Sequence, residues 1–397
     1  MKICFVTSSF PRAAQDHAAP WLAESAQQLK ARGNSVSVFA PSYMGRRQEG
    51  HPGTEVWRFR YAPAAYERLT HEDSSPENLR RGIFWRLVLL SYVITGSLNA
   101  ILYFTRRRFD VIDVHWPFPQ AIFAVIGKLL TGSRLVFHFY ASEILLIKDS
   151  LALKLALRFL LLFSDRIIAI STYTKELLIT ELGVKQPIDV IPFGQSFDSP
   201  ANDAAAGGPP GTGNPLNLLY VGKLIERKGP LYLVEAMKLL KEMEVFANLR
   251  MVGDGYMRAE VLSRIAATGT GDTITLLGFI SKDDLTKEFR NCHILVFPSI
   301  IDSRGDTEGQ GLAPLDALIH CKPAIASAVG GVTDLIKDGE TGFLVPQKDA
   351  EAIARKVLYI KENYLAALKI AENGRRYAIA NFSWESVTDK TLKVYHA

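Results

Sequence analysis

Residues 302–338 read DSRGDTEGQGLAPLDALIHCKPAIASAVGGVTDLIKD, and this stretch is the most informative part of the chain. Glu308 is followed directly by the glycine-rich loop 309–311. The pair Ala313-Pro314 then predicts a helix start, because proline lacks an N–H that the first helical turn leaves without a partner. The sequence therefore predicts a flexible loop that leads into the N-terminus of a helix, with Asp316 in the first turn.

A loop of this kind suits a bound phosphate. The first turn of a helix offers unpaired backbone N–H groups and the positive end of the helix dipole. Carboxylates beside the phosphate can only accept hydrogen bonds, so they suit the hydroxyl groups of a sugar. A phosphate held next to groups that bind hydroxyls indicates a nucleotide-sugar. We expect Glu308, Asp316 and the loop residues Gly309, Gln310, Gly311 and Leu312 to contact it.

Short apolar, β-branched runs alternate with helical patterns along the chain, which predicts parallel sheets with crossover helices. In the first half we expect strands at 3–7, 36–40, 111–114, 135–139, 166–170 and 189–191. Residues 198–215, rich in Ala, Gly and Pro, have the composition of a linker. Beyond it we expect strands at 218–222, 249–253, 273–277, 294–297, 324–327 and 343–345. We predict an α/β protein with two Rossmann-like, doubly wound parallel-sheet domains that face an interdomain cleft.

The composition agrees with a globular, two-domain protein. The chain has 397 residues, of which 48% are hydrophobic and 22% are charged. Its three cysteines, Cys4, Cys292 and Cys321, are scattered and form no disulfide or zinc pattern. Met1 leads straight into a strand-like run without a signal peptide, so we expect a cytoplasmic protein.

The net charge of +5 is unevenly placed around the apolar run 87–104, which approaches the length of a membrane span. Three arginines precede the run and three follow it: Arg80, Arg81, Arg86, Arg106, Arg107 and Arg108. The interpretation that we prefer is a long helix packed in its domain. The alternative is a basic, apolar surface in peripheral contact with anionic lipid at the inner face of the plasma membrane. We expect no nucleic acid partner, because the basic residues are not interleaved with stacking aromatics.

The stretch 302–338 resembles the donor-site signature of the retaining glycosyltransferases of glycosyltransferase family 4 (glycosyl transferases group 1), which have the GT-B fold. That family has Glu, Gly, any residue, Gly, Leu, and a second Glu eight residues after the first. Here the two acids are Glu308 and Asp316. The resemblance extends through LLYVGKLIERKG at 218–229, RMVGDGYM at 250–257 and the N-terminal text. It implies an acceptor-side domain (1–197), a nucleotide-sugar domain (216–380) and a helix (381–397) that returns to the first domain.

The resemblance implies a role for each acid and base of the motif. Glu308 would bind the transferred sugar, and Asp316 would accept from the ribose hydroxyls. Lys223 and Lys228 stand where the family commonly has Arg and then Lys, and both would grip the diphosphate. Arg227 could supply the two-pronged contact that Lys223 lacks. The plainer alternatives are a solvated loop acid, an Asp favoured by the helix dipole alone, and an ordinary basic turn.

Further matches would line the nucleotide. Gly222 ends the strand before Lys223, and Gly253 lies in the similar Gly-Asp-Gly loop. The backbone near Ile280 would bond the edge of the base. Each of these loops alone is also what a turn after a strand requires.

The reacting centre is where the sequence departs from the family. LVFHFYASEI at 135–144 replaces a His-Gly-Ser-Asp text, with Tyr140 at the histidine position and His138 two residues earlier. Positions two apart on a strand face the same side, so either His138 or Tyr140 could serve this centre. The alternative that His138 is a structural histidine of the core fits equally well.

The N-terminal loop 8–20 also departs from the family, because it lacks the family's glycine pair. Asp16 or His17 could contribute side chains there. His115 and Trp116 close the strand 111–114 and could meet the acceptor, but we prefer a plain turn there.

The implied chemistry is transfer of a sugar from a UDP- or GDP-linked donor to a cell-envelope glycan or lipid-linked acceptor, with retention. A same-face substitution is expected, with positive charge and orientation supplied by the enzyme. No paired-Asp metal motif is present, so we expect no metal and no cofactor beyond the donor. Three alternatives stay open: a GT-B nucleotide-sugar 2-epimerase, a non-catalytic nucleotide-sugar-binding protein and an NAD-dependent oxidoreductase. The oxidoreductase is disfavoured because no G-x-G-x-x-G follows the first strand.

Overall fold

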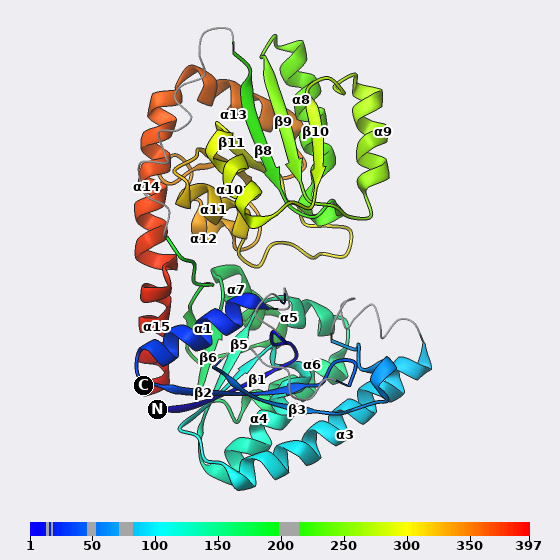
Figure 1. The fold of residues 1–397 in the computed structure, drawn as a ribbon, viewed down its shortest axis with the longest axis vertical. Coiled ribbons are helices and arrows are strands. Elements are labelled where there is room, and N and C mark those ends of the chain that lie inside the picture. Colours follow the sequence, from blue (N-terminus) through cyan, green and yellow to red (C-terminus); the bar gives the residue numbers. More distant parts are fainter. Residues whose placement is uncertain (13–15, 17–18, 46–52, 71–81, 198–213) are drawn as a thin grey trace. The chain divides into compact units, whose positions relative to one another are not determined.

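The computed structural model describes residues 1–12, 16, 19–45, 53–70, 82–197 and 214–397. The chain forms two compact units (Figure 1). Unit 1 comprises Met1–Gly194 and Trp384–Ala397, and unit 2 comprises Gln195–Ser383. Residues 198–213 of the expected linker lie outside the described residues, as do Arg80, Arg81 and His17.

Unit 1 is built on a seven-stranded sheet in the order β3-β2-β1-β4-β5-β6-β7, in which every pair of neighbours is parallel. The strands are β1 Lys2–Thr7, β2 Ser35–Pro41, β3 Glu55–Phe59, β4 Val111–His115, β5 Arg134–Phe139, β6 Arg166–Ala169 and β7 Ile188–Val190. The edge strand β3 was not predicted, because Glu55 and Arg58 interrupt its apolar pattern. His115 ends β4, so the prediction of a plain turn there is wrong.

Helices cover both faces of this sheet. They are α1 Pro20–Ala31, α3 Ile83–Arg106, α4 Pro117–Thr131, α5 Ser142–Ile147, α6 Leu151–Leu161, α7 Thr172–Leu182 and α15 Trp384–His396, with the 3₁₀ turn η1 Ala64–Tyr66. Successive side chains of β4 point to opposite faces of the sheet and so belong to two different cores. Ile112 and Val114 pack with α3, α4, α6 and α7, whereas Val111 packs with α1 and α15. Asp113 and His115 share the side of Val111, because side chains alternate along a strand.

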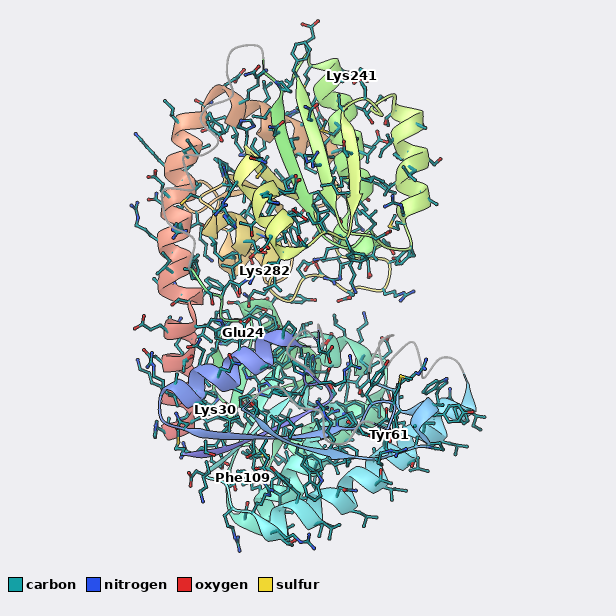
Figure 2. The ribbon with its side chains drawn as sticks, viewed as in Figure 1. Glu24, Lys30, Tyr61, Phe109, Lys241 and Lys282 are labelled. Carbon is teal, nitrogen blue, oxygen red and sulfur yellow. The ribbon has the colours of Figure 1, made fainter. Side chains whose placement is uncertain are left out.

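The helix α3 packs one face only into unit 1. Its buried side includes Val88, Tyr92 and Phe104. Gly96 brings α3 close to α4, because a Cβ there would lie 2.4 Å from the Phe123 ring. Tyr61, labelled in Figure 2, meets Tyr92 of α3 edge-on at 5.1 Å and belongs to the same core. The expected helix is therefore present and packed, but its opposite face is exposed.

Unit 2 is built on a six-stranded parallel sheet in the order β10-β9-β8-β11-β12-β13. The strands are β8 Leu216–Val221, β9 Ala247–Val252, β10 Ile274–Gly278, β11 Ile294–Phe297, β12 Ala324–Ser327 and β13 Phe343–Val345. The helices are η3 Glu226–Lys228, α8 Pro230–Glu242, α9 Arg258–Thr268, α10 Lys282–Asn291, α11 Leu312–Ile319, α12 Val332–Leu335, α13 Ala350–Glu362 and α14 Tyr364–Phe382. One face of the sheet packs on α8, α9 and α13, and the other on α10, α11, α12 and the end of α14.

The predicted fold class is confirmed. Both units are parallel sheets wound with helices on two faces, as doubly wound α/β domains are. Every strand expected from the sequence is present, with ends that differ by no more than two residues, and the structure adds β3.

Candidate functional site

The order of the strands in unit 2 brings two loops together. The strands β8 and β11 are parallel neighbours, so their carboxyl ends lie at the same edge of the sheet. The loop after β8 contains the short turn η3 and leads into α8, and the loop after β11 leads into α11. The motif residues therefore meet because of the topology and not because they are close in sequence.

Glycines let these loops pack backbone against backbone. A Cβ on Gly229 would lie 2.0 Å from the Pro298 carbonyl oxygen. One on Gly253, whose φ is +123°, would lie 2.1 Å from the Gly222 carbonyl oxygen. One on Gly330 would lie 2.1 Å from the Glu308 carbonyl oxygen. Gly222 and Gly253, which were expected to line the nucleotide, therefore also hold the β8 and β9 loops in contact.

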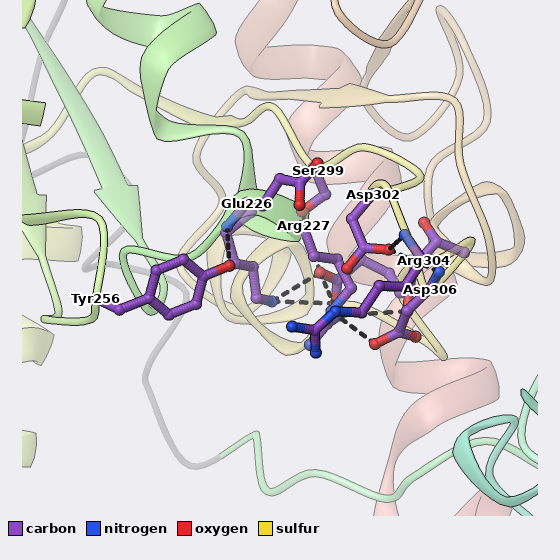
Figure 3. A network of polar contacts seen from close by, with 10 residues as sticks. Glu226, Arg227, Tyr256, Ser299, Asp302, Arg304 and Asp306 are labelled. Carbon is purple, nitrogen blue, oxygen red and sulfur yellow. Dashed lines mark hydrogen bonds and ion pairs between the residues drawn. The ribbon is translucent and has the colours of Figure 1, made fainter. Parts of the chain in front are cut away.

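Glu308 is buried at the centre of these loops between two cations, with 4% of its surface exposed. Lys228 Nζ lies 2.9 Å from Oε1 and 3.0 Å from Oε2 of Glu308, and Arg227 Nη1 lies 2.7 Å from Oε1. The Ser299 hydroxyl donates to Oε1 at 3.1 Å. We name Arg227, Lys228 and Glu308 the cationic cradle; part of its surrounding polar network is drawn in Figure 3.

The side chains of the cationic cradle alter one another's pKa values. Burial alone would raise the pKa of Glu308, but Lys228 and Arg227 outweigh it and hold this pKa below its usual value. Burial also lowers the pKa of Lys228, although Glu308 partly offsets the effect. Glu308 is therefore an ionised hydrogen-bond acceptor, and the cradle carries two cations against one carboxylate.

The surrounding loop fixes Arg227 and the turn η3. Arg227 Nη1 donates to the Thr307 carbonyl at 3.3 Å, and its Nε lies 3.5 Å from Asp306 Oδ2. The backbone N–H of Glu226 donates to the Tyr256 hydroxyl at 3.1 Å (Figure 3). The guanidinium is thus held from two sides, as a positioned anion-binding group requires.

The other expected donor-site residues lie around this edge of unit 2. Lys223 is exposed and makes no ion pair within the described ranges. Gly311, with φ of +91°, precedes α11, and Leu312 begins that helix with its side chain exposed. Ile280 follows β10 and packs on the core. The structure thus joins Glu308, Lys228 and Arg227 directly, and leaves Lys223 free to reach a ligand.

Asp316 is not in the first turn of its helix, so that prediction is wrong. The helix α11 begins at Leu312, one residue before the expected Ala313, which places Asp316 in the second turn. Gln195 Nε2 donates to Asp316 Oδ1 at 3.2 Å. Burial raises the pKa of Asp316 to about 6, although Gln195 and Lys282 oppose the shift. The alternative that Asp316 is present only because it stabilises the helix dipole therefore does not hold.

A second group of polar side chains is buried in unit 1. Asp113 and His115 on β4 and His138 on β5, together with Tyr140, form what we name the histidine cluster. His115 is the register partner of His138. The His115 Nδ1 atom and the Tyr140 hydroxyl lie 2.6 Å apart, and the Tyr395 hydroxyl donates to Asp113 Oδ2 at 2.6 Å.

Several atoms of the histidine cluster lack hydrogen-bond partners. These are Asp113 Oδ1, His115 Nε2 and His138 Nδ1 within the residues that the structure describes. Asp113 Oδ2 lies 3.5 Å from His115 Nε2 and 3.7 Å from His138 Nδ1. Burial lowers the pKa of His115 to about 3. The His138 side chain is 12% exposed and that of His115 only 3%, so His138 is the member that a ligand can reach more easily.

The histidine cluster also has a spacing that a metal ion could bridge. One ligand atom from each of Asp113, His115 and His138 lies within 4.8 Å of the others. Two imidazoles and a carboxylate are ligands that zinc accepts. The residues expected from the sequence included no metal ligand, so this group needs its own test.

A cavity of about 410 Å³ opens within unit 1 and is lined in part by Trp116, whose ring lies 4.8 Å from that of Tyr140 in the histidine cluster. Its lining is largely aromatic and aliphatic, with Trp21, Tyr92 and Leu146 among the contributors. Glu143 is the acid in this lining, and it accepts a hydrogen bond from the Tyr140 backbone N–H at 2.7 Å. Burial raises the pKa of Glu143 to about 7. The cavity combines ring-stacking surfaces with one carboxyl group.

Sequence reasoning missed Ser299, Asp113 and Tyr395. Ser299 lies two residues beyond a fully buried strand, and Asp113 interrupts the apolar text VIDV, so both gave a local signal. Tyr395 gave none, because its contact joins positions 282 residues apart in the chain.

Two family models match the chain: Glycosyltransferase Family 4 over residues 19–195 and Glycosyl transferases group 1 over residues 210–377. The uncharacterised glycosyltransferase MJ1178 of Methanocaldococcus jannaschii is 28% identical over 309 residues, 77% of this chain and 80% of that protein. The amylovoran biosynthesis glycosyltransferase AmsK of Erwinia amylovora is 25% identical over 201 residues, 51% of this chain and 46% of that protein. Anabaena HepE, solved with UDP and glucose, shares the fold, with a TM-score of 0.72 and 18% identity over 100% of both chains.

Proposed function

The chain belongs to the glycosyl transferases of group 1 and has the GT-B fold, and from this premise we propose that it moves a sugar from a nucleoside-diphosphate-sugar to a hydroxyl group with retention. A relative that acts in amylovoran biosynthesis supports a cell-envelope glycan, free or lipid-linked, as the acceptor. The observation that carries the proposal is the cationic cradle.

The cradle suits a diphosphate because it has cations to spare. Arg227 and Lys228 with the nearby Lys223 carry three positive charges, against the two carboxylates of Glu308 and of Asp306, which lies 3.5 Å from Arg227. Negative charge grows on the diphosphate as its bond to the sugar breaks, and fixed cations in a site with little water stabilise that growth. Glu308, which stays ionised, would accept a hydrogen bond from a sugar hydroxyl.

Retention is proposed to follow from substitution on one face of the sugar. The bond between the anomeric carbon and the diphosphate oxygen breaks, and the acceptor oxygen forms its bond on the same face. The acceptor proton passes to the departing diphosphate oxygen. A covalent route would need a free carboxylate nucleophile, whereas Glu308 is held by Lys228, Arg227 and Ser299. This arrangement supports the direct route.

The aromatic cavity of unit 1 supports a place for the acceptor in that unit. Sugar rings and lipid chains both bury apolar surface against side chains such as Trp21 and Trp116. Glu143 and the hydroxyls of Ser8 and Ser9 could fix the orientation of a polar group. His138 is the group that we propose unit 1 brings to the reaction.

A transfer assay tests the proposal. The protein is incubated with UDP- or GDP-linked hexoses and polyprenyl-diphosphate-linked glycans, and NMR of the product reports the anomeric configuration. We expect a glycosidic bond of the same configuration as the donor. An inverted product contradicts the same-face mechanism. Loss of donor to an epimer without acceptor favours the 2-epimerase, and binding of donor without turnover favours a non-catalytic protein.

A further inference from the structure

The outer face of α3 carries an uninterrupted apolar stripe. By length and composition, this helix could cross a membrane. Only 33% of the residues in its most apolar eighteen-residue window are buried within the protein. The exposed residues recur every three or four positions, which places them on one side: Ile83, Leu87, Leu90, Ile94, Leu98 and Ile101. At a rise of 1.5 Å per residue the stripe is about 27 Å long.

The stripe lies along the surface and does not span, because the opposite side of α3 is packed on the core. Val88, Tyr92 and Phe104 are buried there against α4 and the sheet. Folded proteins seldom expose contiguous apolar patches of this length unless a partner covers them.

The helix α6 repeats the pattern on the same side of the sheet. It packs on the same core through Leu157 and Leu161, and like α3 it contacts α4. Its exposed apolar residues also form one stripe: Leu151, Leu155, Phe159 and, just past its end, Leu162. Two helices in one layer therefore present apolar stripes outward.

The charges around these helices favour anionic lipid over a second copy of the chain. Neither α3 nor α6 contains an Asp or Glu. Arg86 and Arg106, near the two ends of α3, are exposed and form no ion pair with another described residue. Arg108 follows, also exposed, and donates to the Leu130 carbonyl at 3.0 Å. A second copy of this chain would bring like charges together, whereas anionic lipid headgroups would neutralise them.

We propose that α3 and α6 form a docking face by which unit 1 lies on an anionic lipid bilayer, with the two stripes in the acyl boundary and the arginines at the headgroups. This arrangement is that of an interfacial amphipathic helix, here held in a folded domain. The proposal does not depend on the donor site, because its readout is lipid binding and not sugar transfer.

Vesicle sedimentation tests the docking face. The full chain is mixed with vesicles of equal parts phosphatidylglycerol and phosphatidylcholine, or of phosphatidylcholine alone. We expect binding to the anionic vesicles that weakens as salt rises, and at least about tenfold weaker binding to the neutral ones. Absence of the chain from the anionic pellet overturns the proposal.

Two variant pairs locate the contact. Leu90→Asp with Ile94→Asp changes residues that are 56% and 51% exposed, and Leu365→Asp changes a residue of α14 in unit 2 that is 66% exposed. We expect the α3 pair to lose most vesicle binding and Leu365→Asp to keep it, with unchanged circular dichroism in both. Equal binding by the α3 pair overturns the α3 contact, and equal binding by Leu155→Asp with Phe159→Asp overturns the α6 contact.

A labelled cysteine gives a second readout that does not rely on disruptive variants. The three native cysteines are buried, so Leu98→Cys can carry a polarity-sensitive fluorophore. We expect a blue shift on addition of anionic vesicles, and none for the label at Leu365→Cys. A chain that is dimeric in light scattering without lipid, and monomeric after the α3 pair is changed, would identify the face as a contact between copies and overturn the proposal.

Discussion

The two buried polar groups of this protein differ in how completely their charges are satisfied. In the cationic cradle of unit 2, Glu308 accepts from Lys228, Arg227 and Ser299. In the histidine cluster of unit 1, Asp113 Oδ1 and two imidazole nitrogens have no hydrogen-bond partner in the described part of the chain. Buried polar groups without partners are rare, so these atoms mark the cluster as a candidate functional site. The cradle therefore holds paired charges, whereas the cluster contains polar atoms for which the described residues provide no partner.

The largest effect that we expect comes from the cradle. Lys228→Ala should reduce turnover by about 10² to 10³, because it removes a fixed cation from the site of growing negative charge. The fold should persist, since Arg227 and Ser299 still hold Glu308. The measurement is kcat together with a thermal melt, and Lys241→Ala, an exposed lysine of α8, is the control. Turnover of Lys228→Ala at the wild-type rate would remove the cradle from the mechanism.

Two alanine variants sharpen the comparison within the cluster. His138→Ala should reduce turnover by about 10²-fold with little change in melting temperature, because it disturbs orientation at an accessible position. His115→Ala should instead lower the free energy of unfolding by about 1–3 kcal/mol, since it leaves the Tyr140 hydroxyl buried without its partner. Denaturant unfolding and initial rates separate the two. If His138→Ala lowered stability and left turnover unchanged, His138 would be a structural histidine of the core.

A smaller, pH-dependent effect is expected at Asp316. Its pKa is raised to about 6, so the carboxylate that would accept from ribose hydroxyls forms as the pH rises through that value. Affinity for a nucleotide-sugar should therefore rise several-fold between about pH 5 and pH 7. Asp316→Asn should flatten this dependence in a titration. A wild-type affinity that is constant over the same range would contradict a role for Asp316 in donor binding.

The sign of the stability effect at Asp316 follows from the same shift. The folded pKa exceeds the unfolded value of about 3.9, so the group stabilises the fold below that value and the contribution is lost as the pH rises through about 6. Asp316→Asn should remove that loss. Melts of both proteins across this pH range measure it.

Removal of metal should have the smallest effect. Dialysis against EDTA should leave transfer unchanged, because the cradle supplies the charge that a divalent ion would otherwise provide. Loss of activity that zinc restores would contradict this expectation. It would then direct attention to Asp113, His115 and His138, whose ligand atoms lie within 4.8 Å of one another.

The same two regions show what the sequence could predict. Glu308 and Lys228 were predicted from the resemblance of their loops to the family's donor-site motif, and the pairing of β8 with β11 places both loops at one edge of the sheet. The first turn for Asp316 was wrong because α11 begins one residue before Ala313. The histidine cluster depends on the register of β4 with β5 and on Tyr395 from the end of the chain. Such long-range pairing leaves no local pattern, so only His138 and Tyr140 were found, without their partners.

The most direct test of the account is binding of UDP and GDP to the wild type, Lys228→Ala and His138→Ala, followed by calorimetry and thermal shift. One nucleotide at a hundredfold excess over its Kd should stabilise the wild type by about 2.7 kcal/mol. We predict that Lys228→Ala loses at least about tenfold in affinity, since a charge-assisted contact to the diphosphate is removed, while His138→Ala binds as the wild type does. Equal affinity of Lys228→Ala and the wild type for both nucleotides would contradict the claim that the cationic cradle holds the diphosphate.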